Sequence, residues 1–287
     1  MNFLKKTKTY SIREKFELAR YSLGYKIFMK TSEELKYRYR LTGELLQKGY
    51  KFNQDKNLLH LNYKINNDDY NFELKKKTSD ALVFHQIIIK EEFKNVINYM
   101  MSKSISCNLM IDAGANIGLT TIYFKSFFHN LKIFSLEPSE EVFSRLERNI
   151  QINNLQNVTL INKGIWSHST RLKGDYSFLD GLDWSFRLVE AKENDQALFE
   201  VCSISDLITE YKMESIDFLK MDIEGGESEV FKSNANMEWL AHVKVIAIEI
   251  HDQFADRVAI EKILISNQFD LSFSGELTIG LNRNLIK

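Results

Sequence analysis

The sequence has 287 residues, of which 44% are hydrophobic and 27% are charged, as in ordinary globular proteins. Its net charge of −1 gives no reason to expect a nucleic-acid partner, and its two cysteines do not indicate a disulfide framework. The first residues lack the apolar core of a signal peptide, and no apolar run is long enough to cross a bilayer. We therefore expect a cytoplasmic protein with one large α/β domain and an appendage.

Residues 1–56 are predicted to form a basic, helical N-terminal extension. The first 50 residues hold 12 lysines and arginines against 5 acidic residues, a surplus of seven, whereas the rest of the chain has an acidic surplus of eight. The stretches 11–28 and 31–50 mix apolar and charged positions, as amphipathic helices do. A solvated helical cap explains this pattern. The alternative is peripheral contact with an anionic partner or membrane surface.

Residues 57–287 are predicted to form a doubly wound, mainly parallel α/β domain. It begins with a hairpin over 57–77, which turns at the Asn-Asn-Asp-Asp sequence, and a segment over 80–101 that leads into a helix. Strands and helices then alternate, which is typical of a sheet covered on both faces. The predicted strands are 108–113, 132–138, 157–162, 216–223 and 243–251, the helices are 118–128, 139–154 and 257–269, and a closing hairpin turns at 274–275. Residues from about 167 to 200 break this rhythm, and we interpret them as an insertion near the site.

The first predicted strand runs into a glycine loop with the spacing D-x-G-A-N-x-G, from Asp112 to Gly118. In a doubly wound sheet, ligands bind at the carboxyl ends of the strands, and Gly114 and Gly118 let the backbone turn and approach a ligand. Asp112 would repel a phosphate, and the spacing is not the G-x-G-x-x-G of dinucleotide sites. S-adenosylmethionine (AdoMet), which carries a sulfonium and an ammonium, fits better. A purely structural turn is the alternative.

The next strand ends supply candidate groups for a nucleoside. Glu137 lies 19 residues after Gly118, and an acidic residue about 20 positions beyond the loop binds ribose hydroxyls in such sheets. Pro138, the only proline in the chain, keeps Glu137 extended at the end of its strand. Gly164 and Trp166 follow the third strand and are predicted to line an adenine pocket, although Trp166 is equally suited to the core.

Polar side chains also follow the fourth and fifth predicted strands. Asp222 and Glu224 come after the fourth strand and His251 after the fifth. Neighbouring strands lie about 5 Å apart, so Asp222 and His251 are expected side by side. His251 would act as a general base near neutral pH, with Asp222 to orient it. A divalent metal held by Asp222, Glu224 and His251 is the alternative, and it is not favoured because the sequence does not show a full set of oxygen ligands.

The motifs at 111–121, 135–139, 216–227 and 247–251 resemble those of the FkbM family of AdoMet-dependent methyltransferases, and the resemblance extends over about residues 80–251. It implies a seven-stranded, Rossmann-like methyltransferase sheet, AdoMet as methyl donor, and a hydroxyl acceptor on a sugar or related natural product. By the motif match, the resemblance assigns to AdoMet binding Asp112, Gly114, Asn116, Gly118 and Glu137. It assigns to the active-site edge Asp222, Glu224 and His251.

Other functions are weighed against this one. A nicotinamide dehydrogenase is disfavoured by Asp112 and by the loop spacing, whereas a non-catalytic binding module and a methyltransferase acting on protein or nucleic acid stay open. For the acceptor we expect a hydroxyl of a small molecule or glycan. The insertion offers Trp184 and its aromatic neighbours Tyr176, Phe178 and Phe186 as a platform for a sugar ring. A lid that packs these aromatic rings inward is the alternative.

Overall fold

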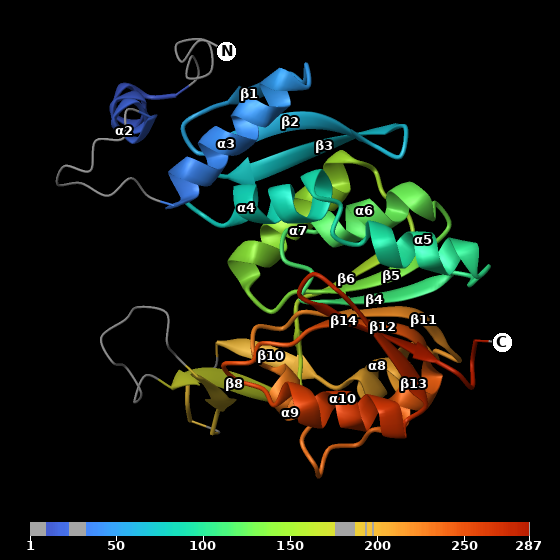
Figure 1. Ribbon diagram of the computed structural model, residues 1–287. Helices are drawn as coiled ribbons and strands as arrows, with labels where there is room; N and C mark the ends of the chain where they lie inside the picture. The colour runs from blue at the N-terminus through green and yellow to red at the C-terminus, as the bar shows by residue number, and fades with distance from the viewer. Residues whose placement is uncertain (1–9, 23–32, 176–186, 193, 197, 287) are drawn as a thin grey trace. The chain divides into compact units, whose positions relative to one another are not determined.

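The computed structural model describes residues 10–22, 33–175, 187–192, 194–196 and 198–286 (Figure 1). The chain divides into two compact units, which are Met1–Glu92 with Arg148–Asn154, and Phe93–Glu147 with Leu155–Lys287. The sequence analysis placed a boundary between residues 56 and 57, which separates an N-terminal extension from a catalytic domain. That boundary stays a prediction. Within the described ranges, no helix has the length and apolar character needed to cross a membrane.

The first unit combines helices with a three-stranded antiparallel sheet. Its elements are α2 (Ile12–Ser22), α3 (Glu33–Gln47), β1 (Phe52–Gln54), β2 (Leu58–Ile65), β3 (Asp68–Lys75), α4 (Asp80–Phe84) and the π-helical η1 (His85–Ile89). The predicted hairpin is confirmed as β2 and β3, which pair from Leu58–Lys75 to Ile65–Asp68. Asn66 and Asn67 form its turn with φ values of 46° and 74°, which asparagine tolerates better than most residues.

The outer edge of β3 is closed by asparagine side chains. The last five residues of α7 (Glu140–Ile152) and the two residues that follow belong to this unit. Asn71 donates its backbone N–H to Asn153 Oδ1 at 2.7 Å, and Glu73 donates its own to Asn149 Oδ1 at 2.9 Å. These amides take the place of a further strand, so the edge is not left open for pairing with another chain.

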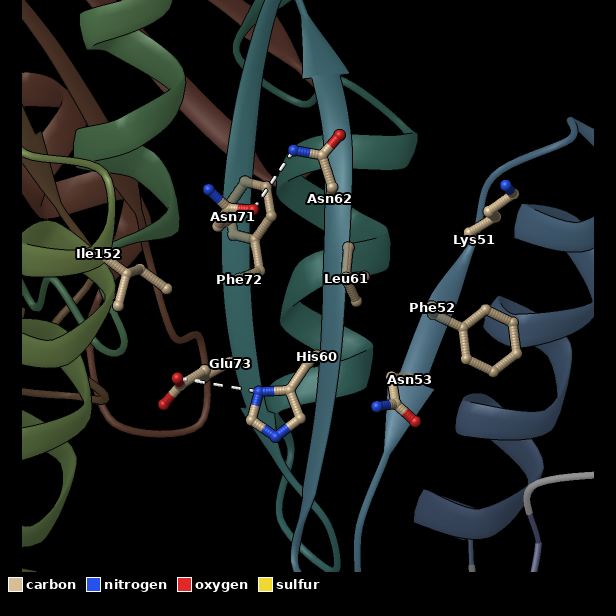
Figure 2. A pocket seen from close by; sticks show the side chains of 10 residues that line it. All are labelled: Lys51, Phe52, Asn53, His60, Leu61, Asn62, Asn71, Phe72, Glu73 and Ile152. Atoms are coloured by element: carbon tan, nitrogen blue, oxygen red, sulfur yellow. Dashed lines mark hydrogen bonds and ion pairs between the residues drawn. The ribbon is translucent and has the colours of Figure 1, made fainter.

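A shallow hollow of about 470 Å³ lies on this sheet, lined mostly by residues of β2 and β3 (Figure 2). Its polar groups already contact one another. Asn62 donates to Asn71 at 3.3 Å, and the His60 ring lies 3.7 Å from Glu73. None of the predicted site residues lines it.

The second unit contains the predicted seven-stranded sheet. Its strands are β4 (Leu109–Ala113), β5 (Lys132–Leu136), β6 (Val158–Ile161), β11 (Ile216–Met221), β12 (Val243–Glu249), β13 (Phe269–Ser274) and β14 (Leu277–Asn282). The order is β13-β14-β12-β11-β4-β5-β6, and only β14 is antiparallel to its neighbours. This arrangement confirms the predicted mainly parallel sheet, and β14 belongs to the expected closing hairpin.

Helices cover both faces of this sheet, which explains why its central strands are apolar throughout. The helices are α5 (Lys94–Ser102), α6 (Leu119–Phe127), α8 (Ile204–Tyr211), α9 (Glu227–Val230), the 3-10 helix η2 (Glu238–His242) and α10 (Arg257–Ser266). Figure 1 shows α5 and α6 on one face and α8 and α10 on the other. On the first face the rings of Phe124 and Phe218 lie 4.7 Å apart, and on the second Leu207 and Leu264 pack with Leu219.

Parts of the predicted insertion and of the residues that flank it form strands that the sequence analysis did not predict. β7 (Gly164–Ile165), β8 (Thr170–Asp175), β9 (Arg187–Glu190) and β10 (Phe199–Cys202) make a four-stranded sheet in the order β7-β10-β8-β9. Arginine, lysine and glycine interrupt the apolar alternation that would have indicated these strands. Trp166, Leu172 and Val201 form its buried cluster. The aromatic segment predicted as a sugar platform, residues 176–186, lies outside the described residues.

Candidate active site

A cavity of about 240 Å³ lies beyond the carboxyl ends of β4, β5 and β11. It brings together seven of the ten predicted site residues, which are Gly114, Asn116, Glu137, Gly164, Trp166, Asp222 and Glu224. Asp112, Gly118 and His251 are not among the residues that line it. The predicted position of the ligand, at the carboxyl edge of a doubly wound sheet, therefore coincides with a real hollow.

The glycine loop is shaped by three residues with left-handed backbone conformations. Gly114, Asn116 and Gly118 have φ values of 76°, 49° and 85°. A Cβ atom at Gly114 would lie 1.8 Å from the carbonyl oxygen of Asp222, so only glycine fits where the loop crosses the end of β11. Gly118 caps the N-terminus of α6 and turns the chain without contacting the cavity.

Glu137 is held in place at the end of β5 by two backbone N–H groups. Its Oε2 accepts from Asn116 N at 3.1 Å, and its Oε1 accepts from Ser139 N at 3.0 Å. The residue is 8% exposed, and burial raises the pKa of its carboxyl group in spite of these bonds. Each carboxylate oxygen can accept a further hydrogen bond, so Glu137 can still bind hydroxyl groups from the cavity.

Trp166 and Gly164 form the wall of the cavity contributed by the small sheet. Trp166 is 6% exposed and packs against Leu172 and Val201, so it is a core residue as well as a cavity residue. Its indole Nε1 is buried and finds no hydrogen-bond partner among the described residues. A buried donor of this kind usually has an acceptor, and a bound ligand can supply one.

Asp112 does not face the cavity, which corrects the argument that its charge meets a cationic ligand directly. The side chain is fully buried, and its Oδ2 accepts from Thr121 Oγ1 at 2.7 Å. Its Oδ1 lies 3.6 Å from Lys220 Nζ. Burial raises the pKa of Asp112, and the Lys220 ammonium counteracts this. Its charge is therefore balanced within the protein.

Lys220 is a residue of this site that the sequence analysis missed. It lies on β11, is 3% exposed, and places Nζ 3.5 Å from Asp222 Oδ2. Burial disfavours its charge, but Asp222 and Asp112 outweigh burial and raise the pKa of Lys220. The signal available in the sequence was one lysine within the apolar strand "IDFLKM".

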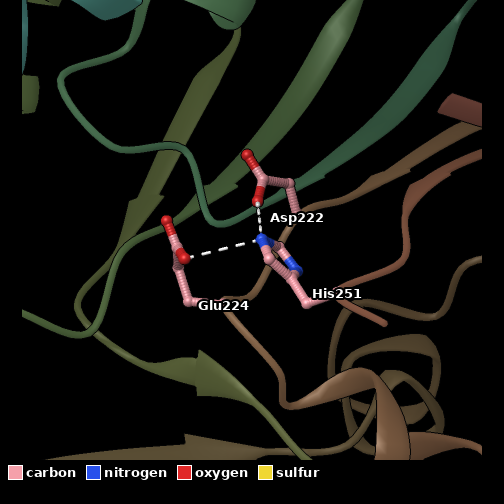
Figure 3. A group of neighbouring side chains, drawn as sticks. All are labelled: Asp222, Glu224 and His251. Carbon is pink, nitrogen blue, oxygen red and sulfur yellow. Dashed lines mark ion pairs between the residues drawn. The ribbon is translucent and has the colours of Figure 1, made fainter. Parts of the chain in front are cut away.

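Asp222, Glu224 and His251 converge at one end of the site, as predicted (Figure 3). His251 Nε2 lies 4.0 Å from Asp222 Oδ1 and 3.5 Å from Glu224 Oε2. One ligand atom of each residue lies within 4.8 Å of the others, a spacing that suits a metal ion. Glu224 has a φ of 54°, and its side chain is 87% exposed.

Glu227, a second residue missed by the sequence analysis, fixes the state of His251. It is fully buried, and its Oε1 lies 3.2 Å from His251 Nδ1 and accepts from Ile223 N at 3.1 Å. The hydrogen bond to Glu227 raises the pKa of His251 to about 9, although burial opposes the charge. The ring is therefore an imidazolium at neutral pH. This does not fit the expectation that His251 accepts a proton there.

Comparisons with known proteins find similarity to methyltransferases. The model of the family described as Methyltransferase FkbM domain matches residues 112–271. Methyltransferase sdnD of Sordaria araneosa is 28% identical over 218 residues, which are 65% of this chain and 83% of that protein. Methyltransferase 1 of Beauveria bassiana is 22% identical over 180 residues, which are 56% of this chain and 72% of that protein.

Among solved structures, the precorrin-6y C5,15-methyltransferase of Geobacter metallireducens has a TM-score of 0.38 at 14% identity. The match covers 66% of this chain and 88% of that one. A likeness at this level carries no argument about function.

Proposed function

This chain belongs to the FkbM family of AdoMet-dependent methyltransferases, and we propose that it transfers the methyl group to a hydroxyl oxygen of a sugar, in a glycan or a natural product. The observation that carries the proposal is the cavity, which joins the glycine loop and Glu137 to the carboxylates Asp222 and Glu224. A hydroxyl acceptor suits these carboxylates because they can accept its proton. The sugar is what the family resemblance implies.

In this proposal AdoMet occupies the cavity with its nucleoside toward Glu137 and Trp166. Glu137 binds the ribose hydroxyls, and the wall of Gly164 and Trp166 contacts the adenine. The buried indole N–H of Trp166 donates to the ligand. Gly114 and Asn116 then lie along the remainder of the donor. The methyl group points toward Asp222, since this carboxylate and Glu224 line the same cavity.

Methyl transfer needs the acceptor oxygen in line with the sulfonium and about 3 Å from the methyl carbon. The carbon–sulfur bond breaks as the carbon–oxygen bond forms, and the donor sulfur becomes a neutral thioether. The hydroxyl proton becomes strongly acidic as its oxygen is methylated, so a carboxylate is basic enough to take it. We assign this role to Asp222. His251, as an imidazolium 4.0 Å from Asp222 Oδ1, orients that carboxylate.

A divalent cation held by Asp222, Glu224 and His251 is the second route. A cation there would lower the pKa of an acceptor hydroxyl and make it the nucleophile. The spacing of the three ligand atoms favours this route, and a set of one imidazole and two carboxylates suits Mn²⁺ or Zn²⁺ better than Mg²⁺. It requires His251 to lose its ring proton first.

Two measurements test the proposed function. Calorimetry should detect binding of AdoMet and no comparable binding of NAD⁺. Methyl-labelled AdoMet should then label an oxygen of a monosaccharide or glycan when the protein is incubated with a panel of sugars, proteins and RNA. Label only on protein or RNA would refute the sugar hydroxyl, and AdoMet binding without any labelled product from cell extracts would favour a non-catalytic module.

A further inference from the structure

Five ionisable side chains form a row that begins at Asp112 in the glycine loop and ends at Glu227, with acidic and basic groups in alternation. In order they are Asp112, Lys220, Asp222, His251 and Glu227, and the shortest distances between successive side chains are 3.6, 3.5, 4.0 and 3.2 Å. Asp222 occupies the middle of the row and is the member that lines the cavity. The ammonium of Lys220 also donates hydrogen bonds to backbone carbonyl groups of the glycine loop.

The contacts of Lys220 are divided between the loop and Asp222. Its Nζ donates to the carbonyl oxygen of Gly114 at 2.6 Å and to that of Ala113 at 3.2 Å. The same ammonium lies 3.5 Å from Asp222 Oδ2, which leaves Oδ1 facing His251. Each oxygen of Asp222 therefore faces a nitrogen of a neighbouring basic side chain, and one of these side chains, Lys220, is also bonded to the loop.

Stability alone is a weak reason for a lysine at this position. Removing an ammonium from water is costly, and an apolar side chain of similar volume is often as stable or more stable. The glycine loop already contacts the end of β11 through its backbone, because Asp222 N donates to Ala113 O at 3.2 Å. The additional contribution of Lys220 is to fix side-chain and carbonyl directions.

We propose that Lys220 is a positioning residue for methyl transfer, which holds the loop carbonyls of Ala113 and Gly114 and the Asp222 carboxylate in a fixed relation. The inference rests on the proposed function, since it takes the loop as the donor site and Asp222 as the proton acceptor. A donor bound to the loop would then be aligned with Asp222 through one side chain. Misplacement by about 1 Å can slow such a reaction by about 10²-fold.

The test replaces Lys220 by methionine, which keeps the length of the side chain and removes its charge and donors. AdoMet affinity, measured by calorimetry on the folded variant, should fall at least tenfold. With an acceptor found in the labelling panel, kcat should fall more than the affinity. Lys220→Arg keeps the charge but cannot place a single nitrogen within reach of all of these oxygens, so it should recover only part of the AdoMet affinity.

A matched control lies near the amino ends of β11 and β12, at the opposite edge of the sheet from the site. Lys244 on β12 forms an ion pair of 2.6 Å with Asp217 on β11, and Asp217 also accepts from the backbone of Asn108 and Leu109. Lys244→Met should lower the melting temperature and leave AdoMet affinity unchanged. The contrast between the two lysine variants separates a loss of positioning from a general loss of an ion pair.

A double-mutant cycle with Asp222→Asn measures the coupling directly. If Lys220 links the loop to Asp222, the effects of the two substitutions on AdoMet affinity should deviate from additivity by at least threefold. Additive effects, or unchanged affinity in Lys220→Met, would overturn the positioning role. If Lys220→Met does not fold, wild-type affinity and kcat in Lys220→Arg would overturn it equally. Absence of AdoMet binding by the unaltered protein would instead refute the proposed function.

Discussion

Replacement of Glu227 by glutamine is the most direct test of the charge state assigned to His251. Glu227 is fully buried, and its Oε1 is the partner of His251 Nδ1 at 3.2 Å. Glutamine has nearly the same shape and can still accept from Ile223 N, so the fold should persist. The negative charge disappears, and with it the main cause of the raised pKa of His251, which is about 9 instead of 6.5.

The pKa of His251 should therefore fall by about 1 to 2 pH units in the variant, because Asp222 and Glu224 still favour the charged ring. The sign of the stability effect follows from linkage. A raised histidine pKa contributes stability that is fully present below pH 6.5 and is lost as the pH rises through about 9. With the side chain 20% exposed and partly screened by water, this contribution is about 1–2 kcal/mol.

The assay is an NMR titration of the His251 ring, combined with unfolding curves between pH 6 and pH 10. The free energy of unfolding of the unaltered protein should decrease over the upper part of this range, and in the variant this decrease should move to lower pH. The ring of His242, which contacts the Glu214 carbonyl at 3.0 Å, lies outside this site, so its NMR signals serve as the internal reference. A His251 pKa near 9 in Glu227→Gln would refute the assignment.

Three further outcomes are expected. Trp166→Phe keeps an aromatic ring and removes the unpaired indole N–H, so AdoMet affinity should fall by about three- to tenfold in calorimetry, and an unchanged value would exclude a hydrogen bond to the donor. Glu137→Ala should lower AdoMet affinity at least tenfold, since each charge-assisted hydrogen bond to the ribose is worth about 1.5–3 kcal/mol. Glu73→Ala, the same substitution in the other unit, is the control and should leave that affinity unchanged. Chelator treatment should leave methyl transfer intact if Asp222 is the proton acceptor, whereas loss of activity that Mn²⁺ restores would establish the metal route.

The sheet and the position of the site could be predicted because both depend on local sequence patterns. Continuous apolar runs separated by amphipathic helices identify parallel strands, and parallel strands fix where their following loops meet. Asp222 and His251 follow β11 and β12, which pair in register from Ile216–Val243 to Met221–Ile248. Their convergence therefore followed from strand order.

The charge balance of the site could not be predicted in the same way. Lys220 on β11 lies opposite Asp112 on β4 in the pairing of the two strands. The two strands are far apart in the sequence, since Lys220 and Ala113, which are in contact, are separated by 107 residues. No sequence spacing indicates which buried acid pairs with which buried base. The direction of Asp112 was therefore misjudged, and Glu227 looked like an ordinary acidic residue in the first turn of a helix.

The strands β8 and β9 were missed for a different physical reason. Among the positions of these two strands whose burial the structure describes, only Leu172 is buried, so there is no pattern of apolar residues at alternate positions. Leu172 is buried, whereas its neighbour Arg171 is exposed and Lys173 is half-buried and paired with Asp195 at 2.7 Å. Strands of this kind depend on pairing with their partners more than on their own pattern.

The alternating charges also bear on which property of the site controls the rate. Lys220 and His251 lie beside the two oxygens of Asp222, and a carboxylate is in general a weak base. A weak base suffices only if the acceptor proton leaves late, after the new carbon–oxygen bond has begun to form. The rate then depends on the alignment of donor, acceptor and Asp222 more than on basicity. A substitution that moves these groups should therefore lower the rate of methyl transfer more than one that changes the pKa of His251. We expect Lys220→Met to have a lower kcat than Glu227→Gln at neutral pH. The reverse order would argue for His251 as the base.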